Sequence, residues 1–253
     1  MADVAIYTAN FGAYDNTLPQ VEQDIPVDWI YLTDGAAYPE LGGDEHAVWN
    51  VHVVEPKHAH PNLAAKVYKA QPPWELGDWT HAIWIDANMQ ITEPSFAREA
   101  MAFINDGMAT WAHPRRDCVY DEGAVCIPGA SPEAQNGRYR NLPLQEQMDA
   151  YRAEGYPEHN GLYASGTMIW TPPASEKVGR AWLEECERWG FQDQLALPVV
   201  CWRLDVQPGI YGISQIERRY TPRVTWRQQL RGDPYYLANR WLRIWPHARE
   251  ATP

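Results

Sequence analysis

The stretch HAIWIDANMQI, residues 81–91, places a carboxylate and an amide two positions apart, at Asp86 and Asn88, directly after an apolar run. Carboxylate and amide oxygens are ligands that hard divalent cations such as Mn²⁺ and Mg²⁺ prefer, and such a cation can hold a diphosphate. The same pair also suits a turn, because Asp and Asn side chains bond readily to nearby backbone amides. The spacing alone therefore leaves a metal site and a turn as alternatives.

Basic side chains that could bind a phosphate occur at two places. Lys66 and Lys69 share one predicted helix, and Arg115 and Arg116 follow a predicted strand. The sequence contains neither a P-loop nor a GxGxxG fingerprint, so a nucleotide would have to be held by a metal ion and by these side chains. The alternative is that they are ordinary surface charges.

Two further side chains could act on a substrate or a metal. His113 lies between an apolar segment and Pro114, where a histidine is either a metal ligand or a hydrogen-bonded edge residue. Asp193 begins the run DQLALPVV, where it either caps the helix that follows or serves as a general base.

The composition is that of a globular protein. Of the 253 residues, 45% are hydrophobic and 21% are charged, which argues against disorder on a large scale. The N-terminus carries no basic region followed by a long apolar segment, and nowhere do about 18 apolar residues follow one another. We therefore expect a protein without a membrane partner, located in the cytoplasm, which for a viral protein would be that of the host. The four cysteines lack CxxC spacing and are expected to be reduced and structural.

Strands and helices alternate along the chain, which predicts an α/β domain with a mostly parallel central sheet. Strands are expected over 4–9, from Trp29, from Ala47, up to Asp86, over 108–114 and over 162–170. Helices are expected over 62–71 with Asn62 as the N-cap, over 94–106, 144–155 and 174–190, and over 193–204 with an interruption at Pro198. Residues 115–141 are expected to be irregular. Ligands of such sheets gather at the carboxyl ends of the strands, where Asn10, Thr33, Asp34, Asp86 and Asn88 are found.

Residues 218–253 differ from the rest of the chain. They contain eight arginines against Asp233 and Glu250, in a protein whose net charge is -12. The arginines are interleaved with the aromatic residues Tyr220, Trp226, Tyr235, Tyr236, Trp241 and Trp245. This composition suits phosphate contact and base stacking, but also carbohydrate or an oligomer interface. We expect one domain over 1–217 and a basic, aromatic-rich C-terminal extension over 218–253, with nucleic acid as a possible partner.

Five segments, in this order, resemble the glycosyltransferase-like domain of the plant mucilage and turgor-regulation proteins and their bacterial and viral relatives. They are YTANFGAYDNTLP (7–19), WIDAN (84–88), HPRRDCVYDEG (113–123), QEQMDAYRAEGYPEHNGLY (145–163) and DQLALPVV (193–200). The resemblance extends from about residue 4 to about residue 203. It implies a GT-A type fold, in which a Rossmann-like nucleotide-binding half and an acceptor half form a single domain.

The resemblance also implies roles for particular residues. Asp86 and Asn88 fall at the position of the DxD motif, which binds a divalent metal and the diphosphate of a nucleotide sugar, and His113 is a candidate further ligand. The remaining expected donor-site residues are Tyr7, Thr8, Asn10 and Asp34 around the nucleoside, Lys66 near the phosphates, Ser165 and Gly166 beside the sugar, and Asp193 with Gln194 facing the sugar or the acceptor. Asn88 in place of a second carboxylate should weaken metal affinity, and Gln192 stands where the family commonly has an arginine.

The predicted activity is metal-dependent transfer of a sugar from a nucleotide sugar, expected to be a UDP-sugar, to a hydroxyl group. If the anomeric centre is inverted, Asp193 is the expected base. The basic extension leads to the hypothesis that the acceptor is a hydroxymethylated base in viral DNA, presented by flipping. The alternatives are a glycan or protein acceptor, a non-catalytic module that binds a nucleotide sugar, and a metal-dependent nucleotidyltransferase.

Overall fold

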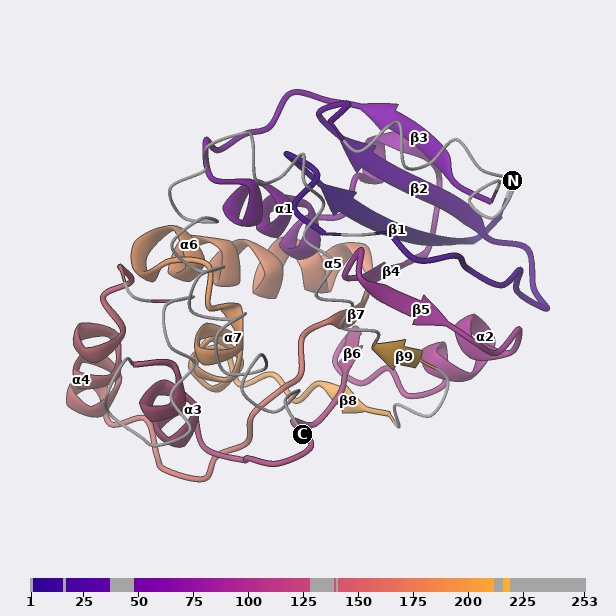
Figure 1. The fold of residues 1–253 in the computed structure, drawn as a ribbon. Coiled ribbons are helices and arrows are strands. Elements are labelled where there is room, and N and C mark those ends of the chain that lie inside the picture. Colours follow the sequence, from indigo (N-terminus) through magenta and orange to yellow (C-terminus); the bar gives the residue numbers. More distant parts are fainter. Residues whose placement is uncertain are drawn as a thin grey trace, which may run out of the picture.

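A mainly parallel β-sheet forms the centre of the molecule (Figure 1). The computed structural model describes residues 2–15, 17–36, 48–127, 139 and 141–211, together with the backbone of 216–218. In spatial order the seven strands are β3 (Asn50–Val53), β2 (Asp28–Thr33), β1 (Val4–Asn10), β4 (His81–Ile85), β7 (Thr167–Trp170), β6 (Met108–Thr110) and β8 (Gly209–Ile210). Strand β7 runs antiparallel to β4 and β6, and the other pairings in this sheet are parallel. The predicted α/β class with a mostly parallel sheet is therefore confirmed.

The register of the parallel strands brings their polar carboxyl ends to one edge of the sheet. Every residue of β1 is buried, as expected for a central strand that is covered on both faces. Tyr7 of β1 lies opposite Trp84 of β4, and Asn10 lies opposite Thr33 of β2. Asp86 follows β4 at the same edge. The sequence-based expectation that these polar residues share one edge agrees with this register.

Helices cover both faces of the sheet. They are α1 (Pro61–Ala70), α2 (Phe96–Met101), α3 (Val119–Cys126), α4 (Leu144–Glu154), α5 (Pro172–Ala174), α6 (Arg180–Trp189) and α7 (Asp193–Arg203), with a 3-10 turn at Trp74–Leu76 and a π-helical turn at Ser175–Gly179. Helices α1, α6 and α7 pack on the face that carries Tyr7 and Trp84, whereas α2 packs on the face that carries Ile6 and Ile83. Helices α3, α4 and α7 share a third apolar cluster. In Figure 1, α3 and α4 lie at the lower left, below α6.

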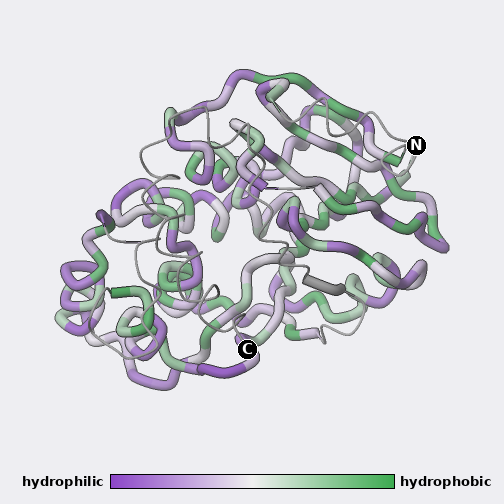
Figure 2. The backbone as a smooth tube through the Cα atoms, in the orientation of Figure 1, coloured by the Kyte–Doolittle hydropathy of each residue, from purple (hydrophilic) through white to green (hydrophobic). Residues whose placement is uncertain are grey.

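Hydropathy follows this layering. Apolar residues recur along the central strands in Figure 2, whereas the helices at the left of the view alternate apolar and polar residues. Such alternation is typical of helices with one face in the core and the other in water. In the part of the chain that the structure describes, no helix has both the length and the apolar character needed to cross a membrane.

Helix α3 lies inside a stretch that was predicted to be irregular. Val119, Tyr120, Val125 and Cys126 are all buried, so the segment shows little of the one-sided pattern that marks a surface helix. Gly123 allows close packing against α4, because a Cβ atom there would lie 2.7 Å from Sδ of Met148. Because the helix is buried on several sides, the sequence-based prediction missed it.

The expected interruption at Pro198 is wrong, because α7 runs from Asp193 to Arg203 with Pro198 inside it. A proline within a helix costs about 3 kcal/mol through the lost hydrogen bond and its ring. Leu195, Leu197 and Val200 of the same helix are fully buried, and each such side chain contributes roughly 1.5–3 kcal/mol. Packing therefore outweighs the penalty at Pro198.

Smaller differences concern the ends of elements. The expected N-cap at Asn62 is wrong, because α1 begins at Pro61 with His60 in the cap position. Proline suits the first position of a helix, where its missing N–H has no partner to lose. A separate two-stranded sheet, which was not predicted, pairs β5 (Met89–Ile91) with β9 (Ile216–Arg218). The predicted basic extension lies outside the described residues, except for the backbone of Arg218.

Candidate functional site

Four charged side chains meet near the carboxyl edge of the sheet. The Lys69 ammonium, with a side chain only 1% exposed, lies 2.7 Å from Oδ2 of Asp193 and 3.3 Å from Oδ1 of Asp86. Lys66 Nζ also lies 2.7 Å from Oδ2 of Asp193. Two lysines thus face two carboxylates, and the buried charges balance one another. We call Lys66, Lys69, Asp86 and Asp193 the buried charge cluster.

Three elements hold the buried charge cluster in place. Lys66 and Lys69 are three residues apart on α1, so both point from the same face of that helix. Asp193 is the first residue of α7, and its carbonyl accepts a hydrogen bond from Nε1 of Trp182 on α6 (2.9 Å). Lys69 Nζ also donates to Oγ of Ser165, in the segment before β7 (3.4 Å). Both lysines were expected to be phosphate candidates, but nothing in the sequence indicated that Lys69 lies in the interior.

The cluster shifts the proton affinities of its members. Burial alone would raise the pKa of Asp193, but the positive charges of Lys66 and Lys69 outweigh it and hold that pKa well below its usual range. Burial would lower the pKa of Lys66, yet the charges of Asp193 and Asp86 raise it above its ordinary value. For the more deeply buried Lys69, burial dominates and lowers the pKa. A carboxylate held in this way is a weak base, because its ionised form is strongly stabilised.

Asp86 belongs to a turn through its backbone and to the buried charge cluster through its side chain. Its backbone amide donates to the carbonyl of Gly166, and its carbonyl accepts from the amide of Met89, both at 2.8 Å. Its Oδ1 accepts a hydrogen bond from Nε1 of Trp84 at 2.9 Å as well as facing Lys69. A Cβ atom at Gly166 would lie 3.3 Å from Oδ2 of Asp86. The two alternatives that the sequence left open are therefore compatible in this structure.

A second group of polar side chains joins the end of β1 to the segment after β4. Asn10 Nδ2 donates to the Asp15 carbonyl at 2.7 Å, and the Asp15 amide donates to Oδ1 of Asn10 at 3.2 Å. Asn88 Nδ2 lies 3.4 Å from Oδ1 of Asp15. Asp15 was missed by the sequence analysis, although it lies in the stretch YTANFGAYDNTLP.

The oxygen of the Asn88 amide shows whether a metal would fit here. Asn88 Oδ1 is buried and accepts no hydrogen bond from the residues that the structure describes. A buried polar oxygen without a partner is costly, and a hard cation would satisfy it. The carboxylate of Asp86, in the same turn, would be a second oxygen ligand, whereas Asp15 accepts a hydrogen bond from the amide nitrogen of Asn88. The donor set therefore fits a divalent cation that prefers oxygen.

His113 lies in a different group. Its Nδ1 accepts hydrogen bonds from the amides of Arg115 (3.4 Å) and Arg116 (3.0 Å), and its Nε2 is 4.0 Å from Oε2 of Glu122. Arg116 is itself paired with Glu122 at 2.6 Å, and Gln192 Nε2 donates to Oε1 of the same glutamate at 3.3 Å. Burial lowers the pKa of His113 more than the charge of Glu122 raises it, so the neutral ring is available as an acceptor. Its role as a metal ligand stays a prediction.

The other predicted donor-site residues occupy varied positions. The fully buried Tyr7 donates from its hydroxyl to the Lys69 carbonyl at 3.4 Å, beneath α1. The buried Thr8 hydroxyl has no hydrogen-bond partner among the described residues. Asp34 accepts hydrogen bonds from the amides of Gly12 (2.9 Å) and Ala36 (3.0 Å), so it connects the ends of β1 and β2. Gln194 is the second residue of α7 and is partly exposed.

The structure thus gathers the predicted residues into separate groups. In the first group Ser165, Asp86 and Asp193 contact Lys69. Lys66 shares Asp193 with Lys69, and Gly166 lies next to Asp86. In the second group Asn10 and Asn88 meet at Asp15. Because Asp86 and Asn88 belong to one turn, the two groups are neighbours. The first group combines ammonium and carboxylate groups, whereas the second combines amide and carboxylate groups.

Comparisons with known proteins show which family this chain belongs to. One solved structure, described as the apo structure of the bifunctional glycosyltransferase WbbM, is similar to this chain with a TM-score of 0.48 and 10% sequence identity. The match covers 84% of this chain and 39% of that one, so this chain spans well under half of the protein it matches. Among curated proteins, no sequence matches this chain significantly. Residues 45–220 match the family described as TOD1/MUCI70, glycosyltransferase-like domain. The matched region is more than half of the chain, and the protein therefore belongs to the TOD1/MUCI70 glycosyltransferase-like domain family.

Proposed function

We propose that this chain transfers a sugar from a nucleotide sugar to a hydroxyl acceptor, and that it binds the donor diphosphate between Lys66 and the Asp86–Asn88 turn. The observation that carries the proposal is the buried charge cluster near the carboxyl edge of the sheet, where α/β proteins bind their ligands. Membership of a glycosyltransferase-like family supports the reaction class. A UDP-sugar remains the expected donor.

The chemistry of the leaving group explains why lysine is needed. When the bond between sugar and phosphate breaks, negative charge develops on the diphosphate, and a fixed positive charge nearby lowers the barrier. Lys66 is the better placed of the two lysines, because its side chain is 14% exposed against 1% for Lys69. Lys69 would hold Asp86 and Asp193 in position from below. Donor binding and structural support are thus divided between two lysines of one helix.

Asp86 and Asn88 are the proposed ligands of a Mn²⁺ or Mg²⁺ ion, and the unpaired Oδ1 of Asn88 supports this assignment. The ion would neutralise the diphosphate as charge develops on it. We add Asp15 as a residue that orients Asn88 through its carboxylate. Asp86 in turn is oriented by Trp84, which donates to its Oδ1.

Asp193 is the proposed base of an inverting reaction. Its contacts with Lys66 and Lys69 lower its basicity, so the role requires Lys66 to turn from Asp193 to the diphosphate when the donor binds. Loss of one ammonium partner would raise the proton affinity of the carboxylate. A retaining reaction would need no such base, and Asp193 would then serve to hold the lysines.

The proposed acceptor is a hydroxymethylated base in viral DNA, with a glycan or protein hydroxyl as the alternative. The proposal rests on the arginines and aromatic residues of 218–253. Phosphate contacts make nucleic-acid affinity fall steeply as salt concentration rises. Titration of duplex and single-stranded DNA at several salt concentrations tests the idea, and binding that does not respond to salt would contradict it.

A non-catalytic nucleotide-sugar binder is the second candidate function. It is favoured by Asn88 in place of a carboxylate and by the low proton affinity of Asp193. Both candidates predict that a nucleotide sugar stabilises the protein, whereas turnover distinguishes them.

The deciding experiment has two stages. Nucleotide sugars are first screened for an increase in melting temperature with Mn²⁺ present, and those that bind are then incubated with the protein and candidate acceptors. Release of a nucleoside diphosphate supports glycosyl transfer, and release of pyrophosphate would indicate a nucleotidyltransferase. Asp86→Asn should reduce metal-dependent turnover by about 100-fold or more, whereas the control Asp149→Asn, on the exposed side of α4, should retain it. Binding without turnover would support the second candidate.

A further inference from the structure

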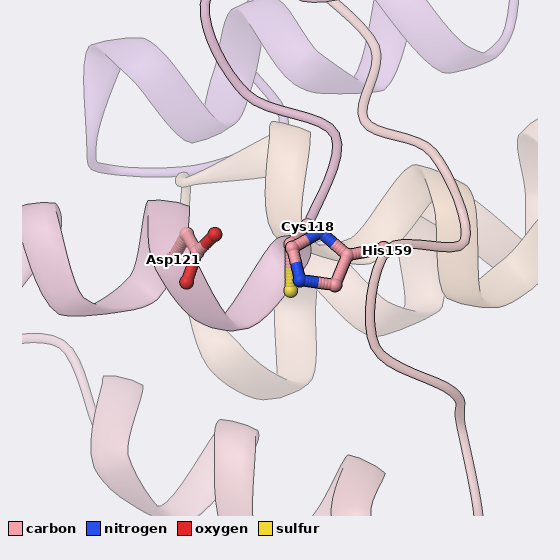
Figure 3. A group of neighbouring side chains, drawn as sticks. All are labelled: Cys118, Asp121 and His159. Atoms are coloured by element: carbon pink, nitrogen blue, oxygen red, sulfur yellow. The ribbon is translucent and has the colours of Figure 1, made fainter.

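A second cluster with metal-binding chemistry lies at the start of α3. One ligand atom each from Cys118, Asp121 and His159 lies within 4.8 Å of the others (Figure 3). Cys118 and Asp121 flank the first turn of α3, and His159 belongs to the segment between α4 and β7. None of these residues belongs to the proposed donor site. We call Cys118, Asp121 and His159 the α3 cluster.

Cys118 is the residue that sets the α3 cluster apart from a group of surface charges. It occupies the N-cap position, yet its side chain makes no capping hydrogen bond to the helix. It is 2% exposed, and the hydrogen bonds found among the described residues do not include its thiol. A buried sulfur atom without a polar partner is therefore directed toward an imidazole and a carboxylate. Cys118 also packs in the apolar cluster shared by α3, α4 and α7, so its two polar neighbours, and not its burial, distinguish it from a core cysteine.

His159 is held by a carboxylate outside the cluster. Its Nδ1 lies 2.8 Å from Oδ1 of Asp117, which leaves Nε2 as the nitrogen that can bind a ligand. Histidines that bind metals usually make this contact with a carboxylate or carbonyl, because it fixes the ring and makes the other nitrogen a better ligand. Figure 3 shows the imidazole ring lying next to the Cys118 sulfur. Asp117 would thus orient the His159 ring toward a bound metal ion.

We propose that Cys118, Asp121 and His159 bind a Zn²⁺ ion, with water in a fourth position. Sulfur, nitrogen and oxygen together suit Zn²⁺, whereas Mn²⁺ and Mg²⁺ prefer oxygen alone. Bonds of about 2.0–2.3 Å in a tetrahedron separate the ligand atoms by roughly 3.3–3.8 Å. Since the atoms lie within 4.8 Å of one another, they need to approach by at most about 1.5 Å, which the exposed side chains of Asp121 and His159 can supply by rotation. On binding, the Cys118 thiol loses its proton to solvent and becomes a thiolate.

The ion would join two segments that are distant in the sequence. The residue after Asp121, Glu122, holds both Arg116 and Gln192, and Gln192 precedes the first residue of α7. Fixing the first turn of α3 to the segment around His159 therefore stabilises the helical group that carries Asp193. The α3 cluster shares no residue with the proposed metal site at Asp86 and Asn88.

Cobalt is the direct probe of the α3 cluster. The full-length protein is freed of metal with a chelator, kept reduced, and titrated with Co²⁺ and then with Zn²⁺. A thiolate-to-cobalt charge-transfer band that saturates at one equivalent and disappears with Zn²⁺ is expected. Cys118→Ser should remove the band, and Cys126→Ala, which removes another buried thiol of α3, should retain it. No band, or a band that persists in Cys118→Ser, would overturn the proposal.

Variants of the exposed ligands test the site even if Cys118→Ser does not fold. His159→Gln and Asp121→Asn should each weaken Zn²⁺ binding by at least 10-fold, and Asp117→Asn should weaken it about 10-fold through loss of the outer contact. Unchanged Zn²⁺ affinity in His159→Gln would reject the site even if Cys118→Ser cannot be purified. Asp86→Asn should leave the cobalt band unchanged, so this test does not depend on glycosyl transfer.

Discussion

Two ion pairs in this protein have nearly the same length but very different surroundings. Lys69 and Asp193 are 2.7 Å apart, with side chains 1% and 6% exposed. His159 and Asp117 are 2.8 Å apart, with side chains 62% and 69% exposed. Water screens the second pair, whereas the first must be balanced by the protein itself. Distance therefore says little about the importance of a charged pair until burial is known.

The difference extends to the sites around each pair. In the buried charge cluster, two lysines and two carboxylates already compensate one another without a ligand. The exposed pair includes His159 of the α3 cluster, whose buried thiol makes no hydrogen bond to the residues that the structure describes. The first arrangement favours a site whose charges are already balanced before its substrate arrives. The second favours a site that a metal ion completes.

The largest effect is expected for Lys69→Met, which leaves Asp86 and Asp193 with less positive charge in the interior. Removal of one partner of a buried ion pair typically costs about 3–5 kcal/mol, because the remaining charge stays desolvated. Urea denaturation measures the change in the free energy of unfolding. Lys66→Met is the matched comparison on the same helix, and its cost should be smaller because Lys69 still balances Asp193. An equal loss in the free energy of unfolding for the two variants would show that the deeper burial of Lys69 does not make it more important for stability than Lys66.

The second effect concerns catalysis. Asp86→Asn should reduce metal-dependent release of nucleoside diphosphate by about 100-fold or more, the loss typical of removing one preorganised electrostatic group from an active site. Steady-state kinetics at several Mn²⁺ concentrations checks the prediction. Asp121→Asn removes a carboxylate of the α3 cluster instead and should leave the Mn²⁺ dependence unchanged. If both variants lose the same Mn²⁺ dependence, the two clusters cannot be assigned to separate metals.

The sequence predicted the part of the fold that depends on local patterns. Strands β1, β2 and β4 were expected because their apolar runs end in polar residues, and their shared edge follows from parallel pairing. Helix α3 was not expected, because a helix buried on several sides has no periodic pattern to reveal it. Continuation of α7 through Pro198 was missed because packing, which the local sequence does not show, outweighs the cost of proline.

The sequence predicted the partners of the site residues poorly for a similar reason. Lys66 and Lys69 look alike in sequence, and only the packing of α1 on the sheet separates the partly exposed lysine from the buried one. Asp15 becomes a candidate site residue only through its contact with Asn88, which lies far away in the chain. The α3 cluster likewise depends on a loop that returns to Cys118 from beyond α4. Residue types indicated possible chemistry, whereas three-dimensional contacts decided the partners.

A third prediction concerns the pH dependence of the proposed base. Lys66 and Lys69 hold the pKa of Asp193 well below its usual range, although burial alone would raise it. In the wild type, the carboxylate therefore stays ionised as the pH falls, and Asp193 should not set the acid limb of kcat/KM. Lys66→Met removes one positive charge, so the pKa of Asp193 should rise and the acid limb should move to higher pH. The rate should be followed with several donor concentrations, and an unmoved limb would argue against Asp193 as the base.

The same group links pH to stability. Because the folded-state pKa of Asp193 is depressed, its contribution to stability is present above the pKa of the unfolded chain and is lost as the pH falls through the folded-state value. Acid unfolding of Lys66→Met should therefore begin at a higher pH than that of the wild type. Asp149→Asn, a change to an exposed carboxylate on α4, is the control and should not alter the onset.

The smallest effect is expected at the exposed pair. In metal-free protein, Asp117→Asn should leave the urea midpoint unchanged, because both side chains of the pair already lie in water. With Zn²⁺ at a concentration that saturates the wild type, however, the variant should gain less stability, since ligand binding stabilises the folded state in proportion to affinity. Urea titrations with and without Zn²⁺ separate the two contributions. A large loss in metal-free Asp117→Asn would mean that this pair supports the fold by itself, and the contrast with Lys69 and Asp193 would fail.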